Sequence, residues 1–283
     1  MTVKLVHNLV LSGGGVKGLS ICGALKRLIE LSKDKDHVIL DIKNILGVSV
    51  GAIIGFLYNI GYTPSELIDK LLDKDFGDLT SISILSLIEN YGIDSGESII
   101  EYINELLDHK GIDKCITFKQ LYSKTNIKLQ IAATNLSRNC QTIFDYESYP
   151  DLQILQAIRM SYSIPFVFSC VKFQDCIYVD GGLSDNYPIE IYNHDTKHTF
   201  GIQMISEHSG LKSNTFQMYV YAIINCLKIQ LEDKCESECT LNINADITSS
   251  ISFDINSEMK KDLVFLGYRE CTRFFDERYC DRD

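Results

Sequence analysis

Short apolar runs alternate with amphipathic segments along most of the 283-residue chain. Residues 5–11 (LVHNLVL) are mostly apolar, which indicates a short buried strand, and they lead into a run of glycines. From residue 18 to residue 32 the apolar positions recur at helical spacing, which predicts a helix. Further strands are expected at 44–48, 127–134, 143–146, 177–179 and 199–205, and further helices at 50–60, 95–108, 152–161, 218–232 and 260–275. This alternation predicts an α/β fold, with a mainly parallel central sheet flanked by helices.

Two segments in the first quarter of the chain carry detailed helix signals. The segment 50–60 is apolar on every side, so a helix there must be buried all round and packed directly on the sheet. Gly51 and Gly55 lie one helical turn apart, where missing side chains permit close backbone approach. Residues 63–66 (Thr-Pro-Ser-Glu) form a capping box with a proline at the first helical position. With no linker or repeat evident, we expect residues 1–283 to form a single domain.

One apolar segment, residues 79–90 with the sequence LTSISILSLIEN, matches no motif. The simpler interpretation is an ordinary core helix, and this is the one we favour. The alternative is a mobile cap that meets lipid, an apolar route to an interface that suits an acidic protein.

The charge balance excludes several classes of function. Lysine and arginine number 27 against 38 acidic residues, a formal net charge of −11. Nucleic-acid binding requires clustered basic residues, which the chain lacks, and an acidic protein gains no attraction to anionic membranes. The chain shows no signal peptide, and its most apolar run, residues 47–62, is too short and too interrupted to span a membrane. We expect a soluble cytoplasmic protein whose contact with membranes or micelles is transient and apolar.

The ten cysteines do not indicate a metal site. Their spacing is irregular, and the tightest pair, Cys235 and Cys239, lies in an acidic stretch with no histidine nearby. Zinc sites usually need two close pairs of ligands. We therefore expect reduced thiols and no metal ligands among them.

The strongest chemical signal is the pentapeptide Gly47-Val48-Ser49-Val50-Gly51, which lies between a predicted strand and the buried helix. A serine hydroxyl becomes an effective nucleophile when a tight turn holds it out for attack, and flanking glycines permit that turn. The helix that starts at Val50 directs its positive end at Ser49, which favours negative charge developing there. We predict that Ser49 is a catalytic nucleophile, with a purely structural turn as the alternative.

A second glycine-rich turn, again between a strand and a helix, consists of Ser12, Gly13, Gly14, Gly15, Val16, Lys17 and Gly18. Successive backbone N–H groups without side chains form an anion-binding nest, which beside a nucleophilic serine would act as an oxyanion hole. The same residues fit the dinucleotide fingerprint G-x-G-x-x-G, with Asp41 near the place of a ribose-binding acid. That alternative leaves the serine motif unexplained. A nucleoside-triphosphate loop is excluded, because Leu19 follows Gly18.

An Asp-Gly-Gly motif supplies the second candidate catalytic group. Asp180 ends a short β-like run and is followed by Gly181 and Gly182. Alone, such an aspartate would be a turn residue that bonds its own backbone, but beside a nucleophilic serine it is the candidate base. The alternative base is one of six histidines, none of which sits in the turn that an α/β-hydrolase triad requires. His194 and His198, within NHDTKH, are expected to be surface residues of a solvated loop.

The three motifs GGGVKG, GVSVG and DGG, in this order, resemble those of the patatin-like phospholipase family. The resemblance continues in YGIDSGESIIEYINELL, IAATNLSRNCQTIFDY, AIRMSYSIPFVFSCV and LVFLGYREC, so it covers most of the chain. It implies the three-layer α/β architecture of that family and a Ser–Asp dyad that cleaves lipid acyl esters.

Carried over by matching position, the resemblance implies a role for each motif. Ser49 would attack the ester carbonyl, and Asp180 would take the serine proton and later activate the deacylating water. Amides of the glycine run 13–15 would hold the oxyanion. Lys17 occupies the basic position of the glycine-rich motif, where it is either solvated or orients the loop.

We therefore expect a lipid acyl hydrolase of the phospholipase A or lysophospholipase type, acting through a covalent acyl-Ser49 intermediate. No metal or organic cofactor is expected, because nucleophile, base and oxyanion donors all come from the chain, which also lacks a calcium-loop pattern. Two alternatives are a catalytically silent lipid-binding or interaction protein of the same fold and a nucleotide-binding oxidoreductase. Head group, acyl position, chain length and oligomeric state stay open, because they depend on packing.

Overall fold

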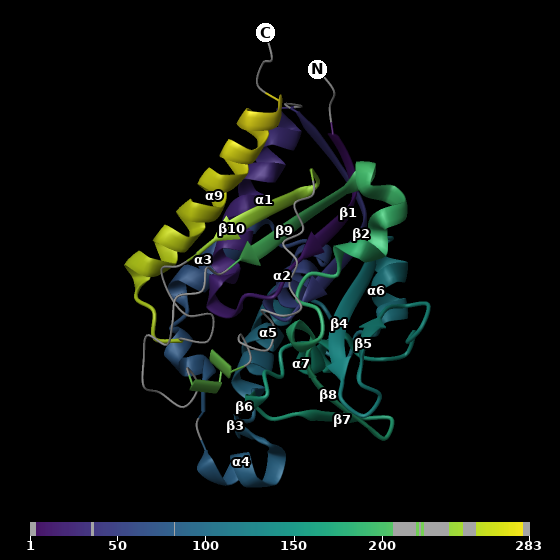
Figure 1. The fold of residues 1–283 in the computed structure, drawn as a ribbon, viewed down its shortest axis with the longest axis vertical. Coiled ribbons are helices and arrows are strands. Elements are labelled where there is room, and N and C mark those ends of the chain that lie inside the picture. Colours follow the sequence, from purple (N-terminus) through teal and green to yellow (C-terminus); the bar gives the residue numbers. More distant parts are fainter. Residues whose placement is uncertain are drawn as a thin grey trace.

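A large mixed sheet forms the middle layer of the protein. The structure is a computed structural model, and it describes residues 4–34, 37–81, 83–205, 219–220, 222–223, 238–245 and 253–279. Its eight described strands are β1 (Lys4–Leu11), β2 (Val38–Val48), β4 (Lys128–Asn135), β5 (Cys140–Phe144), β7 (Val171–Phe173), β8 (Cys176–Asp180), β9 (Thr199–Ile205) and β10 (Thr240–Asn244). Their order is β10-β9-β1-β2-β4-β8-β7, with β5 also paired to β4 (Figure 1). Strands β10, β9, β1, β2 and β4 are parallel to one another. Strands β5 and β8 pair antiparallel with β4, and β7 pairs antiparallel with β8. The predicted mainly parallel central sheet is confirmed.

The described helices are α1 (Gly18–Lys33), α2 (Val50–Asn59), α3 (Pro64–Asp73), α4 (Ile84–Asn90), α5 (Glu97–Lys110), α6 (Phe118–Thr125), α7 (Ile154–Ser161) and α9 (Ser257–Tyr279). Shorter elements are the 3-10 helices η1 (Gly15–Lys17), η2 (Phe76–Leu79), η3 (Gly181–Leu183) and η4 (Ile189–His198), and the strand pair β3 (Gly92–Asp94) and β6 (Phe166–Phe168). Of the six helices predicted with both ends, five are confirmed. Of the sixth, 218–232, only residues 219–220 and 222–223 lie within the described chain, and these are helical. None of the helices in the described ranges is long and apolar enough to cross a membrane.

Apolar side chains pack on both faces of the sheet, because successive residues of a strand point to opposite sides. Leu9 and Leu11 of β1 join the larger core, which α1, α2, α7 and α9 cover. Val10, between them, joins a smaller core with Tyr187 and Tyr192 around η4. Full burial of such a side chain contributes roughly 1.5–3 kcal/mol. The sheet is therefore the middle of three layers, and α9 lies beside α1 on its helical face (Figure 1).

Helix α2 packs directly on the sheet, as its all-apolar sequence predicts. Its side chains from Gly51 to Leu57 are buried, except for the half-buried Ile53. A Cβ atom at Gly51 would clash with the carbonyl oxygen of Leu11, so only glycine allows the first turn of α2 to approach the end of β1. The amino terminus of α2 is thereby fixed at the carboxyl ends of the strands.

The predicted capping box at the start of α3 is also confirmed. The Glu66 backbone N–H donates to Thr63 Oγ1 at 3.2 Å, and the Thr63 N–H donates to Glu66 Oε2 at 2.8 Å. Helix α5 ends as expected at Gly111, whose left-handed φ of 62° suits a glycine.

The interpretation of residues 79–90 as a core helix is wrong. Leu79, at the end of η2, is buried, but α4 exposes 62% of Leu85 and 74% of Ile88. This seven-residue helix packs mainly against the short strand β3, which offers too little surface to cover its other side. Figure 1 shows α4 projecting from the lower end of the molecule, away from the main sheet.

Candidate active site

The carboxyl ends of β2 and β8 meet on one edge of β4. Val48, the last residue of β2, pairs with Ala132, and Asp180, the last residue of β8, pairs with the next residue, Ala133. Because β5 occupies the opposite edge of β4 over the same residues, β2 and β8 share one edge and approach each other end to end. One residue of strand spans about 3.3 Å. The structure therefore brings Asp180 next to the turn that carries Ser49.

Ser49 occupies a strained turn between β2 and α2. Its φ of 53° and ψ of −123° are rare for a residue with a side chain, and such strain persists where the surroundings hold it in place. A Cβ atom at Gly47 would lie 2.5 Å from the Ala52 backbone nitrogen, so the turn requires glycine there. The predicted strand–turn–helix around Ser49 is confirmed, and its side chain lines a cavity.

A second serine, which our sequence reasoning missed, holds this turn. The Ser49 backbone N–H donates to Ser161 Oγ at 2.8 Å, and the Ser161 hydroxyl donates to the Ala132 carbonyl oxygen at 2.6 Å. Ser161 is fully buried at the end of α7. It lies in the motif-like stretch AIRMSYSIP, but nothing in that stretch distinguishes its hydroxyl from those of its neighbours.

The glycine-rich turn lies against Ser49. A Cβ atom at Gly13 would be 3.3 Å from the Cβ of Ser49, so this glycine permits the contact. The Gly13 N–H donates to the Asn186 carbonyl oxygen at 3.3 Å, which differs from the expectation that Gly13 offers an oxyanion donor. Gly15 has a left-handed φ of 54° and begins η1, where the first N–H groups have no acceptor within the helix. The Gly13 N–H is therefore already engaged, whereas no helical acceptor is available to the N–H of Gly15.

The remaining residues of the glycine-rich turn support its shape. Lys17 is buried, which excludes the solvated alternative for this side chain. A Cβ atom at Gly18 would clash with the side chain of Val50, so this glycine lets the start of α1 pack against α2. Val16 is buried and lines the same cavity as Ser49.

Asp180 is buried and held by backbone contacts at the end of β8. Its Oδ1 accepts a hydrogen bond from the Gly182 N–H at 2.7 Å, the local bond expected of a turn aspartate. Its own N–H donates to the Ser163 carbonyl oxygen at 2.8 Å, and the guanidinium of Arg159 donates to Ser163 Oγ at 2.5 Å. A Cβ atom at Gly181 would clash with the Ala132 carbonyl oxygen, so this glycine allows the chain to turn beside β4.

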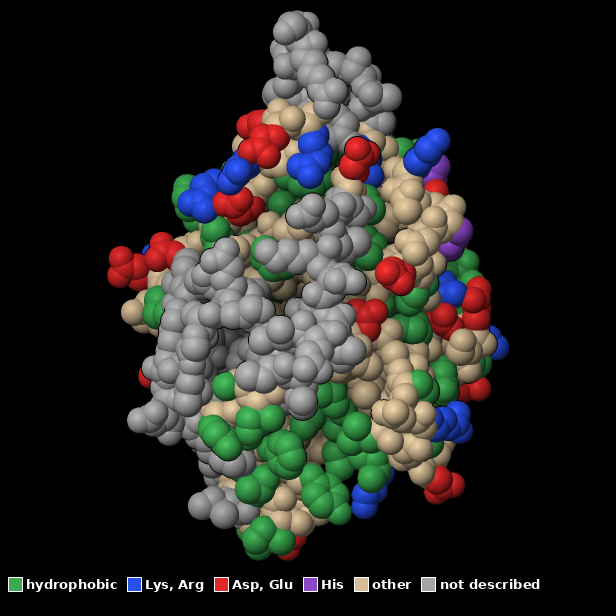
Figure 2. All heavy atoms as spheres, in the orientation of Figure 1, with side chains coloured by type: hydrophobic (Ala, Val, Ile, Leu, Met, Phe, Trp, Pro, Cys, Tyr) green, Lys and Arg blue, Asp and Glu red, His purple; other side chains and the backbone are tan. Residues whose placement is uncertain are grey.

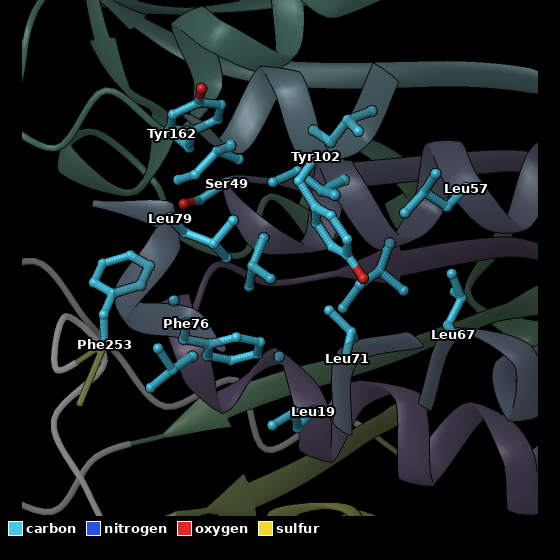
Figure 3. Close-up of a pocket in the computed structure, with 18 of the residues that line it drawn as sticks. Leu19, Ser49, Leu57, Leu67, Leu71, Phe76, Leu79, Tyr102, Tyr162 and Phe253 are labelled. Atoms are coloured by element: carbon cyan, nitrogen blue, oxygen red, sulfur yellow. The ribbon is translucent and has the colours of Figure 1, made fainter. Parts of the chain in front are cut away.

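An apolar cavity opens beside Ser49 (Figure 3). The empty space in and around it, including open solvent at its mouth, is about 920 Å³. Ser49 lies toward one end with Tyr162 and Leu79, and Leu57 and Leu67 lie toward the other (Figure 3). Helices α2, α3 and α5 supply ten of the 21 residues of the wall: Val50, Ile53, Ile54, Leu57, Leu67, Leu71, Ile99, Tyr102, Ile103 and Leu106.

The tyrosines of the cavity wall present rings to the cavity, because their hydroxyls are bonded elsewhere. Tyr102 donates to the Lys70 carbonyl oxygen at 2.9 Å, and Tyr162 donates to the Gly96 carbonyl oxygen at 2.7 Å. Burial raises the pKa of both phenols, so both stay neutral at physiological pH. A cavity of this kind suits a long apolar group whose reactive end reaches Ser49.

Comparison with known proteins agrees with this geometry. Residues 9–192 match the family model described as patatin-like phospholipase. Probable lipid hydrolase 463L of Invertebrate iridescent virus 6 is 33% identical over 238 residues, which cover 80% of this chain and 79% of that protein. The chain belongs to the patatin-like phospholipase family. It is also 31% identical to the uncharacterized protein R571 of Acanthamoeba polyphaga mimivirus over 281 residues, 93% of this chain and 92% of that protein.

Solved structures show the same patatin-like fold. VipD from Legionella pneumophila superposes with a TM-score of 0.61 at 17% identity, covering 96% of this chain and 67% of that chain. The type III effector protein ExoU superposes with a TM-score of 0.53 at 14% identity, covering 99% of this chain and 54% of that chain. At these identities the likeness concerns the α/β fold alone.

Within this patatin-like fold, the dinucleotide alternative fails on position, and so does a histidine base among the described residues; His208 lies outside them. Asp41 pairs with Lys43 at 2.7 Å and lies 3.5 Å from His7, and not beside the glycine-rich turn. His7 precedes Ser12 by five residues of β1, about 17 Å along the strand. Among the described residues that line the cavity around Ser49, none is a histidine.

Proposed function

We propose that this patatin-like phospholipase hydrolyses fatty-acyl esters of lipids, in the manner of a phospholipase A or lysophospholipase. The observation that carries the proposal is the position of Ser49, a strained serine at the meeting point of β2 and β8 that faces an apolar cavity. The name of the viral relative, a probable lipid hydrolase, supports the same class of substrate.

The proposed reaction uses groups of the chain alone. Ser49 Oγ attacks the ester carbonyl carbon while the Asp180 carboxylate accepts the hydroxyl proton, and that proton passes to the leaving alcohol. Asp180 then deprotonates a water molecule as it attacks the acyl-Ser49 carbonyl carbon, and that proton passes to Ser49 Oγ as the bond to the fatty acid breaks. The N–H groups of Gly14 and Gly15 and the amino terminus of α2 would stabilise the oxyanion. A single donor of this kind is worth roughly 3–4 kcal/mol.

The acyl chain is proposed to lie along α2, with the head group outside. From Val50 to Leu57 the cavity follows eight residues of this helix, about 12 Å. Each buried methylene group contributes roughly 0.8 kcal/mol, so a chain that fills this length binds far better than a short one. The polar head group, which the apolar wall cannot bind, would stay outside the cavity, on the Ser49 side of the ester bond.

Two variants and a covalent probe test the proposal. Ser49→Ala and Asp180→Asn should each abolish ester hydrolysis by the purified protein, and Ser49→Ala should also abolish labelling by a fluorophosphonate. Ser123→Ala and Asp175→Asn, both on exposed surface, are the matched controls and should keep wild-type rates. Full activity in either site variant would refute the dyad. A folded wild-type protein that fails to react with the probe would instead favour a silent lipid-binding protein.

We further propose that the protein meets lipid through an exposed apolar surface at α4, formed by Leu85, Ile88, Tyr91 and Phe166 and called here the α4 patch. Figure 2 shows hydrophobic side chains gathered at the lower end of the molecule, where α4 lies in Figure 1. Phe166 has a left-handed φ of 65° and is half exposed, an arrangement that costs strain. Two residues later on β6, Phe168 lines the cavity, so the patch adjoins the proposed acyl site.

Vesicle binding tests the α4 patch. With a net charge of −11, the protein should bind zwitterionic phosphatidylcholine vesicles through apolar contact, with little dependence on salt. The double variant Leu85→Asp/Ile88→Asp should lose this binding, whereas Phe265→Asp, at a 63% exposed phenylalanine on α9, should not. Equal co-sedimentation of both variants with vesicles would reject the α4 patch as the lipid contact.

A further inference from the structure

Two histidines and an aspartate converge at the side of the sheet where β9 begins. His7 lies on β1, and Asp195 and His198 lie on η4, immediately before β9. One ring nitrogen of each histidine and one carboxylate oxygen of Asp195 all lie within 4.8 Å of one another. The two imidazole rings stack with centroids 4.9 Å apart, and His198 Nδ1 is 2.6 Å from Asp195 Oδ1. The expectation of a surface position is confirmed for His198, whose side chain is 40% exposed, but this residue ends a 3-10 helix and stacks on His7 where a solvated loop was expected.

A network of hydrogen bonds holds the aspartate in this cluster. Asn8 Nδ2 donates to Asp195 Oδ2 at 3.2 Å and to Thr199 Oγ1 at 3.1 Å. Asn44 Nδ2 in turn donates to Asn8 Oδ1 at 2.7 Å, and the Thr199 hydroxyl donates to the Asp195 carbonyl oxygen at 2.8 Å. One carboxylate oxygen is thus anchored to β1 while the other faces His198. Outer partners of this kind are typical of carboxylates that bind metal ions.

The spacing of these groups is close to that of a tetrahedral zinc site. Zinc binds imidazole nitrogen and carboxylate oxygen at about 2.0–2.2 Å, so two ligands of one ion lie roughly 3.4 Å apart. The present separations, 2.6 Å between His198 Nδ1 and Asp195 Oδ1 and no more than 4.8 Å between any two of the three ligand atoms, are close to that value. Between 29% and 40% of each of the three side chains is exposed, which leaves room for water as a fourth ligand.

We propose that His7, Asp195 and His198 form a binding site for a transition-metal ion of the Zn²⁺ type. Nitrogen and oxygen ligands of this mixture suit such ions, whereas calcium and magnesium prefer oxygen alone. The carboxylate of Asp41 lies 3.5 Å from His7 Nε2, where it balances the positive charge of the ion or orients the imidazole. Lys43 pairs with Asp41 at 2.7 Å and partly neutralises the charge of that carboxylate.

The site would be structural, since it lies away from the proposed catalytic residues. The ion would join β1, which leads into the glycine-rich turn, to η4, which follows the loop after Asp180. An ion that binds the folded chain more tightly than the unfolded chain stabilises the folded state, and here it would link two segments far apart in the sequence. Occupancy should therefore raise the melting temperature without changing the chemistry at Ser49.

Binding of Zn²⁺ to the full chain, measured by calorimetry after removal of metal with a chelator, tests the site. We expect one Zn²⁺ per chain at this site and at least about a 10-fold loss of affinity in His7→Ala and in His198→Ala. His194→Ala removes an exposed histidine from the same segment and serves as the matched control, with unchanged binding. Asp195→Asn adds a variant that keeps the size of the side chain and should also bind weakly.

Co²⁺ as a spectroscopic substitute separates this site from the cysteines. Binding through nitrogen and oxygen gives weak visible bands without sulfur-to-metal charge transfer, and Zn²⁺ should abolish them. Wild-type affinity in both His7→Ala and His198→Ala, with native circular dichroism, would overturn the proposal. Charge-transfer bands from thiolate sulfur, seen when Co²⁺ fills the site of highest affinity, would overturn the proposal as well.

Discussion

The Ser161 hydroxyl clamps the backbone of Ser49 onto the central sheet. It accepts the Ser49 N–H at 2.8 Å and donates its own proton to the carbonyl oxygen of Ala132 on β4. The clamp explains how a serine with a φ of 53° keeps a conformation that side chains rarely adopt. Helix α7 thus fixes the orientation of the proposed nucleophile without touching the reacting atoms.

Ser161→Ala should lower kcat by about 10-fold to 100-fold with little change in KM, because a misplaced nucleophile slows chemistry while the cavity stays intact. The variant should also lose about 1–3 kcal/mol of stability, since it leaves the Ser49 N–H without its partner in a buried site. Steady-state kinetics and urea unfolding measure the two effects. Ser20→Ala is the matched control: Ser20 is equally buried, but its hydroxyl has no hydrogen-bond partner among the described residues. It should keep both activity and stability.

Leu57→Phe should shift the substrate preference toward shorter acyl chains, because the larger ring fills the end of the cavity remote from Ser49. We expect the ratio of short-chain to long-chain kcat/KM to rise by about 10-fold, because the ring takes the space of one or two methylene groups of the longer acyl chain. A series of p-nitrophenyl esters of increasing length measures the ratio. Ile68→Phe, at a buried position outside the cavity wall, controls for overpacking. An unchanged chain-length profile in Leu57→Phe would place the acyl chain elsewhere.

Glu66→Ala should destabilise the protein at neutral pH by about 1 kcal/mol, through loss of the capping box of α3. Hydrogen bonds from the Thr63 backbone and then from Lys110 lower the pKa of Glu66 to about 2. A carboxyl group with a lowered pKa stabilises the folded state above its unfolded pKa of about 4.3, and this stabilisation fades as the pH falls toward 2. The difference from wild type should therefore shrink between these pH values.

The capping box of α6 provides the control for this pH dependence. There Gln120 Oε1 accepts the Thr117 N–H at 2.9 Å, in the same geometry but without a titratable group. Gln120→Ala should cost a similar free energy of unfolding that does not vary with pH over the same range. Urea titrations at several pH values measure both variants, and parallel curves for the two would contradict the assignment to the Glu66 charge.

Alkylation of the native protein at pH 8 should modify Cys115 and Cys140 before the other cysteines that the structure describes, because both are exposed. Burial raises the pKa of Cys22 and of Cys271 to about 12, so their reactive thiolate forms are negligible at this pH. Mass spectrometry of peptides after timed exposure to iodoacetamide measures each rate. Urea should bring all four cysteines to similar rates, and early labelling of Cys22 in native protein would contradict its burial.

Local patterns were enough to predict most helices and strands. The strand–turn–helix around Ser49, the capping box at Thr63 and the strand at Thr199–Ile205 depend on residues close together in the chain, so periodicity and turn chemistry reveal them. The prediction weakened where tertiary contacts override local pattern. Strand β2 begins at Val38, six residues before the predicted start at Asn44. The charged residues Asp41 and Lys43 interrupt the apolar pattern there, although the strand continues through them.

The sequence by itself determined the family motifs, the α/β class and the identities of Ser49, Asp180 and the glycine turns. Only the tertiary structure decided that β2 and β8 meet on β4, that Ser161 holds the turn at Ser49, and that α4 exposes Leu85 and Ile88. The same holds for His7 and His198, which are remote in the chain and stacked in space. The physical reason is that strand register and side-chain packing join distant segments, and no local spacing of residues encodes those distances.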